Sequence, residues 1–161
     1  TGHHQTTALC LESLDRLASD GSLKPGRSFL DLGTGSGILG IAAAKLGLVG
    51  LGLDIDPVAV DNARENAALN RVEDRLELGS GSIDSLPDDR RFDCILANIL
   101  ANPLIDMAEA ICRRLARPGV LVLSGILVEQ ADRVAAAYVA EGLGAPQVSH
   151  SGEWALLVFR R

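Results

Sequence analysis

Aromatic side chains are scarce in this sequence, at 3% of 161 residues, although hydrophobic residues of all kinds make up 47%. The core must therefore be built from Leu, Ile, Val and Ala, a composition that suits a parallel sheet flanked by helices. Long apolar runs are also missing: no segment approaches the roughly 20 residues that a membrane-spanning helix needs, and nothing resembles a signal peptide. We therefore expect a single domain with no membrane partner.

Cysteine and positive charge are also in short supply. Cys10, Cys94 and Cys112 are odd in number and far apart, with no C-x-x-C pair. This spacing argues against a disulfide framework and a metal site, and it favours the reducing cytoplasm, with Cys94 in the core. The formal net charge is −6. Because affinity for nucleic acid comes from clustered Lys and Arg, we expect no direct nucleic-acid partner.

What the sequence does contain is a glycine-rich turn between a short apolar run, Phe29–Leu32, and an apolar helical pattern over 38–46. Glycine at alternate positions allows a sharp bend, and the free N–H groups at the start of the following helix can face an anionic or polar ligand. The unit is thus typical of a nucleotide-like cofactor site at the end of a first strand.

Two cofactor classes fit this turn. The segment Gly35–Gly40 matches the G-x-G-x-x-G pattern of dinucleotide-binding proteins. Two residues earlier, Asp31-x-Gly33-x-Gly35-x-Gly37 is the pattern of S-adenosylmethionine-dependent methyltransferases. Asp54, which ends the second expected strand, does not discriminate, since both classes place an acid on the ribose hydroxyls.

The rest of the chain alternates expected strands and helices, which predicts a doubly wound α/β sheet with right-handed crossovers. The expected strands are 29–32, 49–53, 75–78, 92–97 and 120–124, followed by a terminal antiparallel hairpin of 148–150 and 154–159, seven strands in all, mostly parallel. The expected helices are an N-terminal one capped by Thr6 or Thr7, then 38–46, 58–69, 103–115 and 128–140.

Ligands of such sheets bind beyond the carboxyl ends of the strands. Gly33, Asp54, Ser80 and Asn98 all follow or end expected strands, so we expect them to meet in one crevice. A dehydrogenase would need a second half-sheet for nicotinamide, and only one mononucleotide half is present. Methyl transfer depends chiefly on alignment of the reacting groups, and a site without an obvious general base suits it.

At this point the sequence resembles the PrmA-type methyltransferases of ribosomal protein L11. The resemblance is carried by segments spread over the whole chain: Thr1–Thr7, Gly33–Leu39, Leu53–Pro57, Asn98–Ala101, Leu123–Leu127 with Glu129-Gln130, and Glu153-Trp154. The Asn-Ile-Leu and Ser-Gly-Ile-Leu segments are more specific to the family than the glycine turn. Gln5 departs from the pattern, because the family usually has Pro there.

The resemblance implies a Rossmann-like class I methyltransferase fold, with residues 1–161 forming the S-adenosylmethionine-binding catalytic domain and the family's separate N-terminal recognition domain absent. It implies methyl transfer to lysine and N-terminal amines of ribosomal protein L11 in the cytoplasm, by an enzyme that we expect to be a monomer. Two alternatives remain: a methyltransferase of the same fold with another protein or small-molecule acceptor, and a nicotinamide dinucleotide-binding module.

The resemblance also implies roles for individual residues. Thr7, Gly33, Gly35, Asp54 and Asn98 would bind the cofactor, and Asn98 would also be catalytic, its side-chain oxygen orienting a neutral amine. Asp54 would accept hydrogen bonds from the ribose hydroxyls.

Other polar residues near the expected site have simpler interpretations. Asp56 followed by Pro57 is typical of a helix start, so we expect Asp56 to be a cap. We expect Asp31 to brace the glycine turn. His4, Ser80 and Ser82 receive no assigned role.

Overall fold

The structure is a computed structural model that describes residues 2–161, and side chains from residue 4 onward. A seven-stranded sheet has the strand order β3-β2-β1-β4-β5-β7-β6. The strands are β1 (Ser28–Leu32), β2 (Val49–Asp54), β3 (Leu76–Ser80), β4 (Phe92–Asn98), β5 (Leu115–Leu127), β6 (Gln147–Ser151) and β7 (Trp154–Arg160). The first five pair in parallel, and β7 is antiparallel to both β5 and β6. The predicted mostly parallel sheet with a terminal hairpin is confirmed.

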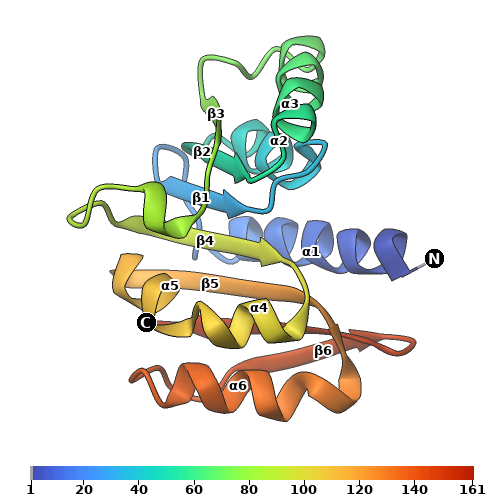
Figure 1. Ribbon diagram of the computed structural model, residues 1–161, viewed down its shortest axis with the longest axis vertical. Coiled ribbons are helices and arrows are strands. Elements are labelled where there is room, and N and C mark those ends of the chain that lie inside the picture. Colours follow the sequence, from blue (N-terminus) through green and yellow to red (C-terminus); the bar gives the residue numbers. More distant parts are fainter. Residues whose placement is uncertain (1) are drawn as a thin grey trace.

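Helices cover both faces of this sheet (Figure 1). They are α1 (Gly2–Ser19), α2 (Ile38–Lys45), α3 (Pro57–Leu69), α4 (Ala101–Asp106), α5 (Ala108–Arg114) and α6 (Ala131–Val139), with short 3-10 turns η1 (Ile83–Ser85) and η2 (Val128–Gln130). One core layer lies between the sheet and α4, α5 and α6, and the other lies against α1, α2 and α3. Both layers are mainly aliphatic, as the composition predicts, and Cys94 is fully buried in the second.

Alternate residues of each strand enter alternate layers. In β4, Ile95 and Ala97 face the α4–α6 layer, whereas Cys94 and Leu96 face the α1–α3 layer. The same alternation places four polar residues on the α1–α3 face: Asp31, Asp54, Asn98 and Ser124. Each of them lies two residues after a strand residue that is on that face, or that is paired in register with a residue on that face. The polar residues at the strand ends therefore share one face of the sheet as well as one edge.

The N-terminal boundary differs from the expectation. Helix α1 already includes residues 2–7, so Thr6 and Thr7 lie inside the helix and the predicted cap at either residue is wrong. Gln5, unlike proline, has a backbone N–H and a favourable helix propensity, and this allows the helix to continue through the segment. Thr1 lies outside the described residues.

Two expected helices differ from the prediction, one by division and one by a later start. The predicted helix over 103–115 is instead α4 and α5, separated at Met107, and Leu115 joins the sheet because it pairs with Phe92. The predicted helix over 128–140 begins as a 3-10 turn, because the Leu127 N–H donates to Gln130 Oε1 at 2.9 Å and the Val128 N–H donates to the Glu153 carbonyl at 2.8 Å. Strand β5 extends well beyond 120–124, with an irregular segment before Val120.

Candidate functional site

The glycine turn follows β1 and uses three left-handed glycines, with φ of 68° at Gly33, 57° at Gly35 and 89° at Gly37. The Thr34 N–H donates to the Leu53 carbonyl at 2.9 Å, which ties the turn to β2. A Cβ added at Gly35 would have its nearest neighbour 4.0 Å away, whereas one at Gly37 would lie 3.2 Å from Ala63 Cβ. Bare main chain at Gly35 therefore borders open space, a cradle that a ligand can occupy, while Gly37 serves the packing of α2 against α3.

Asp31 braces this turn from below, as predicted. Its carboxylate is buried and accepts hydrogen bonds from Thr34 Oγ1 at 2.6 Å and from the Gly40 N–H at 3.1 Å. Burial raises the pKa of Asp31 from 3.8 to about 6, although these two hydrogen bonds oppose the shift. Asp31 is thus a structural acid whose charge costs free energy at neutral pH.

This cost makes stability depend on pH in a defined direction. Between pH 4 and 7 the unfolded chain loses the Asp31 proton before the folded chain does, so the contribution of Asp31 to the free energy of unfolding should fall as pH rises. The shift from 3.8 to about 6 corresponds to a contribution on the order of 3 kcal/mol. Asp31→Asn keeps an oxygen acceptor without the charge. Denaturant unfolding at pH 4.5, 5.5 and 7 should show the variant gaining on the wild type as pH rises; a constant difference would contradict the assignment.

Asp54 ends β2 with its carboxylate held at both oxygens. Oδ2 accepts the Gly35 N–H at 2.9 Å and Oδ1 accepts the Asp56 N–H at 3.0 Å. The side chain is only half-buried, so it retains access to a ligand. An oriented carboxylate beside the open Gly35 cradle can accept hydrogen bonds from a diol. Asp56 accepts the Val58 N–H at 2.9 Å as the N-cap of α3, which confirms the predicted cap.

Asn98 ends β4 in register with Ser124 of β5. The next residue, Ile99, donates its N–H to the Ser124 carbonyl at 3.1 Å. A Cβ added at Gly33 would lie 2.8 Å from Ile99 Cγ2, and one at Gly125 would lie 2.6 Å from the Ile99 carbonyl oxygen and 3.0 Å from Asn98 Oδ1. The Asn98-Ile99 segment therefore lies close to the main chain of Gly33 and Gly125, and a side chain at either glycine would displace it.

Helix α1 covers the α1–α3 face beside these strand ends. Thr6 and Cys10 are buried, and Thr7 is half-buried. Burial raises the pKa of the Cys10 thiol to about 12. Cys10 packs in the same core layer as Val120 and Val122, so this turn of α1 lies over β5. Thr7 thus lies on the helix that packs against the sheet face carrying Asp31, Asp54 and Asn98, while Thr6 is the more buried of the two.

The remaining candidates have structural explanations or open positions. Ser82 caps η1, with its N–H donating to Ser85 Oγ at 3.0 Å. Ser80 is exposed at the end of β3, opposite Asp54. Among the described side chains, those of residues 4–161, no group of three or more His, Cys, Asp or Glu could hold a metal ion, and no helix within residues 2–161 is long and apolar enough to span a membrane.

Sequence reasoning missed two features of this edge. The first is the close approach of Ile99 and Gly125, which nothing local in the sequence indicates because the two residues are far apart along the chain. Several large apolar side chains are also exposed after the strand ends: Ile38, Ile55, Val58, Leu100 and Val128. A ligand at this edge would cover part of this apolar surface.

Comparison with known proteins gives a consistent result. The family profile described as "Ribosomal protein L11 methyltransferase (PrmA)" matches residues 1–161. A protein of Pelobacter propionicus named ribosomal protein L11 methyltransferase is 44% identical over 162 residues, which cover all of this chain and 52% of the relative. A protein of the same name from Methylococcus capsulatus is 53% identical over 144 residues, or 88% of this chain and 46% of the relative. The chain thus spans about half the length of the curated relatives it matches.

Among solved structures, the ribosomal protein L11 methylase of Lactobacillus delbrueckii subsp. bulgaricus superimposes with a TM-score of 0.88 at 35% identity. The match covers all of this chain and 80% of that one. The overall fold of this chain is thus one already seen in a protein of that name.

Proposed function

The chain belongs to the ribosomal protein L11 methyltransferase (PrmA) family, and on that premise we propose that residues 1–161 form a methyltransferase domain that transfers methyl groups from S-adenosylmethionine to amines of ribosomal protein L11. The family match over 1–161 carries this proposal. It also supports the interpretation of the glycine turn as the Asp31-x-Gly33-x-Gly35-x-Gly37 pattern of S-adenosylmethionine-dependent methyltransferases.

The residues present suit this cofactor. The open cradle at Gly35 would admit it against bare main chain, and Gly33 lies beside it in the same turn. The Asp54 carboxylate, already oriented by two backbone N–H groups, would accept the ribose hydroxyls. Thr7 would add a hydroxyl from α1, and Asn98 an amide from the end of β4. When bound, S-adenosylmethionine supplies a methyl group that its sulfonium has already activated.

In this proposal Asn98 performs the main task at the reacting end. Its side-chain oxygen accepts an N–H of the incoming amine and so directs the nitrogen lone pair. The orientation of Asn98 is maintained by Gly125 on one side and by Ile99, pressed against Gly33, on the other. The protein's contribution is thus alignment, and the amine must arrive neutral.

The need for a neutral amine predicts a pH dependence. Lysine amines have a pKa near 10.4 and α-amino groups near 7.7–8.0. The rate of methyl transfer to lysine should therefore rise about tenfold per pH unit between pH 7 and 9, whereas transfer to an N-terminal amine should level off near pH 8. Single-turnover rates on an L11 protein with a blocked N-terminus, compared with the unblocked protein, separate the two; a flat profile for both would argue against attack by a free neutral amine.

The acceptor itself is tested directly by mass. The domain is incubated with S-adenosylmethionine and purified ribosomal protein L11, with an equal amount of other ribosomal proteins as competitors. We expect L11 to gain whole methyl units and the others to gain none. We expect the affinity for S-adenosylhomocysteine to be similar to that of a full-length family member. Methylation of another protein in preference to L11 would contradict the proposed acceptor but not the proposed cofactor.

A further inference from the structure

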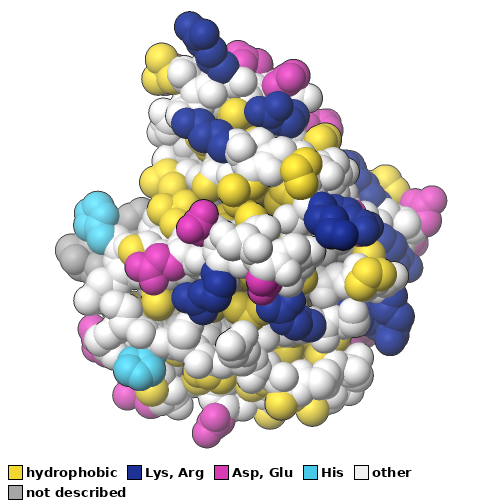
Figure 2. Space-filling model, turned by 180° about the vertical axis from the view of Figure 1, so that it is seen from behind, with side chains coloured by type: hydrophobic (Ala, Val, Ile, Leu, Met, Phe, Trp, Pro, Cys, Tyr) yellow, Lys and Arg dark blue, Asp and Glu magenta, His cyan; other side chains and the backbone are white. Residues whose placement is uncertain are grey.

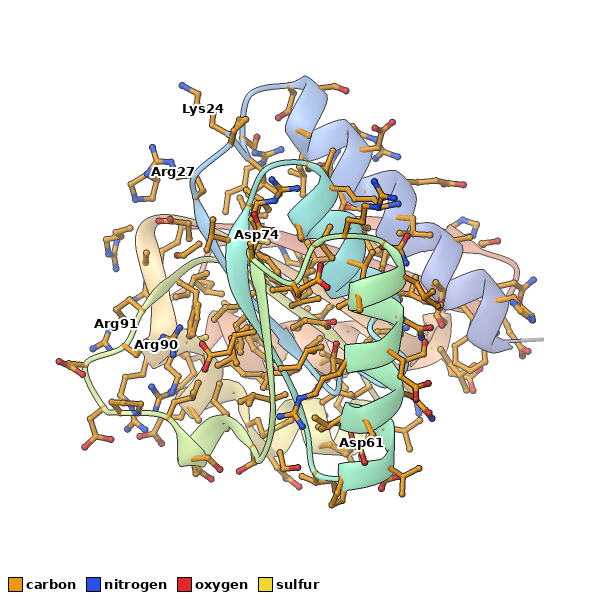
Figure 3. The ribbon with its side chains drawn as sticks, turned by 90° about the horizontal axis from the view of Figure 1, so that it is seen from above. Lys24, Arg27, Asp61, Asp74, Arg90 and Arg91 are labelled. Carbon is orange, nitrogen blue, oxygen red and sulfur yellow. The ribbon has the colours of Figure 1, made fainter. Side chains whose placement is uncertain are left out.

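A second site lies at the opposite edge of the sheet, where the strands begin. A cavity of about 390 Å³ is bounded by the loop before β1, by the segment before Val120 in β5 and by the last residues of β7. Its charged lining is four cations, Lys24, Arg27, Arg160 and Arg161, and one carboxylate, Asp93. In Figure 3 Lys24 and Arg27 project from this edge, and Figure 2 shows several Lys and Arg side chains along its right-hand side as well as others at the top and centre of the view.

These cations are only partly neutralised. Arg160 pairs with Asp20 at 3.3 Å and also donates to Ser22 Oγ, and Arg27 lies 3.9 Å from Asp93. Arg161 donates to the Cys112 carbonyl at 2.6 Å. Among the side chains of residues 4–161, none forms a hydrogen bond or ion pair with the Lys24 side chain.

Asp93 cannot neutralise more of this charge by moving. Its Oδ2 already accepts the Ser28 N–H at 2.9 Å and the Ser28 hydroxyl at 3.1 Å. Four cations against Asp20 and Asp93 leave two positive side-chain charges uncompensated. In a chain of net charge −6, this is a local excess of the opposite sign.

A neighbouring cavity at the same edge has a lining in which positive and negative side chains are balanced. It has about 430 Å³ and is lined by Arg75, Arg90 and Arg91 together with the carboxylates of Glu73, Asp74 and Glu77. Arg90 and Arg91 lie on the same side as Lys24 and Arg27 in Figure 3, with Asp74 nearby. Because the positive and negative side chains of this second cavity are equal in number, its charge is balanced without a bound anion.

We propose that the cavity around Lys24, Arg27, Arg160 and Arg161 binds a phosphate group, at a site separate from the methyl-transfer edge. A phosphate monoester carries −1.5 to −2 charges at pH 7 and each phosphodiester of an RNA backbone carries one, so one monoester or two adjacent backbone phosphates would compensate the two side-chain charges. Three of the four cations are guanidinium groups, whose planar forks suit phosphate oxygens. The phosphate can come from a small polyphosphate or from the backbone of RNA, and the net charge of the whole chain limits RNA binding to this local patch.

The test uses three probes: inorganic pyrophosphate, a short single-stranded RNA and a glutamate-rich peptide. Binding is measured by calorimetry for the wild type, for the double variant Lys24→Gln with Arg27→Gln, and for Arg133→Gln as a control that removes an exposed cation elsewhere. We expect pyrophosphate binding to weaken at least tenfold in the double variant and to stay unchanged in Arg133→Gln. An unchanged affinity for S-adenosylhomocysteine in all three proteins shows that the fold and the other edge are intact.

The outcomes separate the sources of the phosphate. Binding of both pyrophosphate and RNA, with RNA affinity falling steeply as salt rises, supports a site for the RNA backbone. Binding of pyrophosphate alone supports a small phosphate ligand. Binding of the glutamate-rich peptide alone overturns the proposal in favour of an acidic protein partner. Absence of pyrophosphate binding, or equal binding by the double variant, overturns it outright.

Discussion

Gly125→Ala is expected to destabilise the protein by about 3 kcal/mol and to slow methyl transfer about 100-fold in the molecules that remain folded. The φ of Gly125 is +84°, a left-handed conformation that costs alanine roughly 1–2 kcal/mol. The added Cβ would also lie 2.6 Å from the Ile99 carbonyl oxygen and 3.0 Å from Asn98 Oδ1, so the Asn98-Ile99 segment must shift. Denaturant unfolding measures the first effect, and single-turnover methylation at saturating cofactor measures the second.

Gly21→Ala provides a matched control. The φ of Gly21 is +83°, nearly that of Gly125, but a Cβ there would meet nothing within 4 Å. It should therefore show the conformational cost alone, with no change in the rate of methyl transfer. Equal loss of stability and activity in both variants would mean that the contact with Asn98 is unimportant.

The second large effect is expected at Asp54. Asp54→Ala should weaken S-adenosylhomocysteine binding by roughly 1.5–3 kcal/mol, or about 10- to 150-fold, because hydrogen bonds to a charged acceptor are lost. The substitution also frees the Gly35 and Asp56 N–H groups that orient the carboxylate, so part of the loss arises from a looser glycine turn. Calorimetry with S-adenosylhomocysteine measures the affinity directly, without dependence on turnover.

Asp56→Ala separates this effect from general loss of stability. Asp56 also accepts a backbone N–H, but as the N-cap of α3, so its removal should cost about 1 kcal/mol of stability and leave the affinity unchanged. If instead Asp54→Ala binds S-adenosylhomocysteine as tightly as the wild type while remaining folded, the ribose is held by another residue and the proposed site must be revised.

Much of the fold could be predicted because its signals are local. The apolar run over 29–32, the Asp56-Pro57 helix start and the hairpin around Ser151–Glu153 each depend on residues close together in sequence, and all three are confirmed. Local sequence patterns gave the wrong secondary structure where a residue distant in sequence formed a competing contact. Leu115 looked helical by its neighbours but pairs with Phe92 in the sheet, and residues 128–130 tighten into a 3-10 turn against Glu153.

The candidate site divides in the same way. From the sequence alone, a glycine turn after the first strand, an acid after the second and an asparagine after the fourth are enough to indicate a cofactor edge, because parallel strands bring their carboxyl ends together. Their roles as cofactor and acceptor ligands remain predictions.

Only the tertiary structure decided how these groups are held. The contacts of Ile99 with Gly33, of Gly125 with Asn98, and of Asp54 with the Gly35 N–H join residues that lie on different strands and turns. The cluster of Lys24, Arg27, Arg160 and Arg161 likewise joins the beginning and the end of the chain, at positions where the sequence shows only scattered cations. Hydrophobic periodicity and turn residues depend on neighbours along the chain, so the sequence reveals them. Close contacts and charge clusters between distant residues depend on distances in space that exist only after the sheet has assembled.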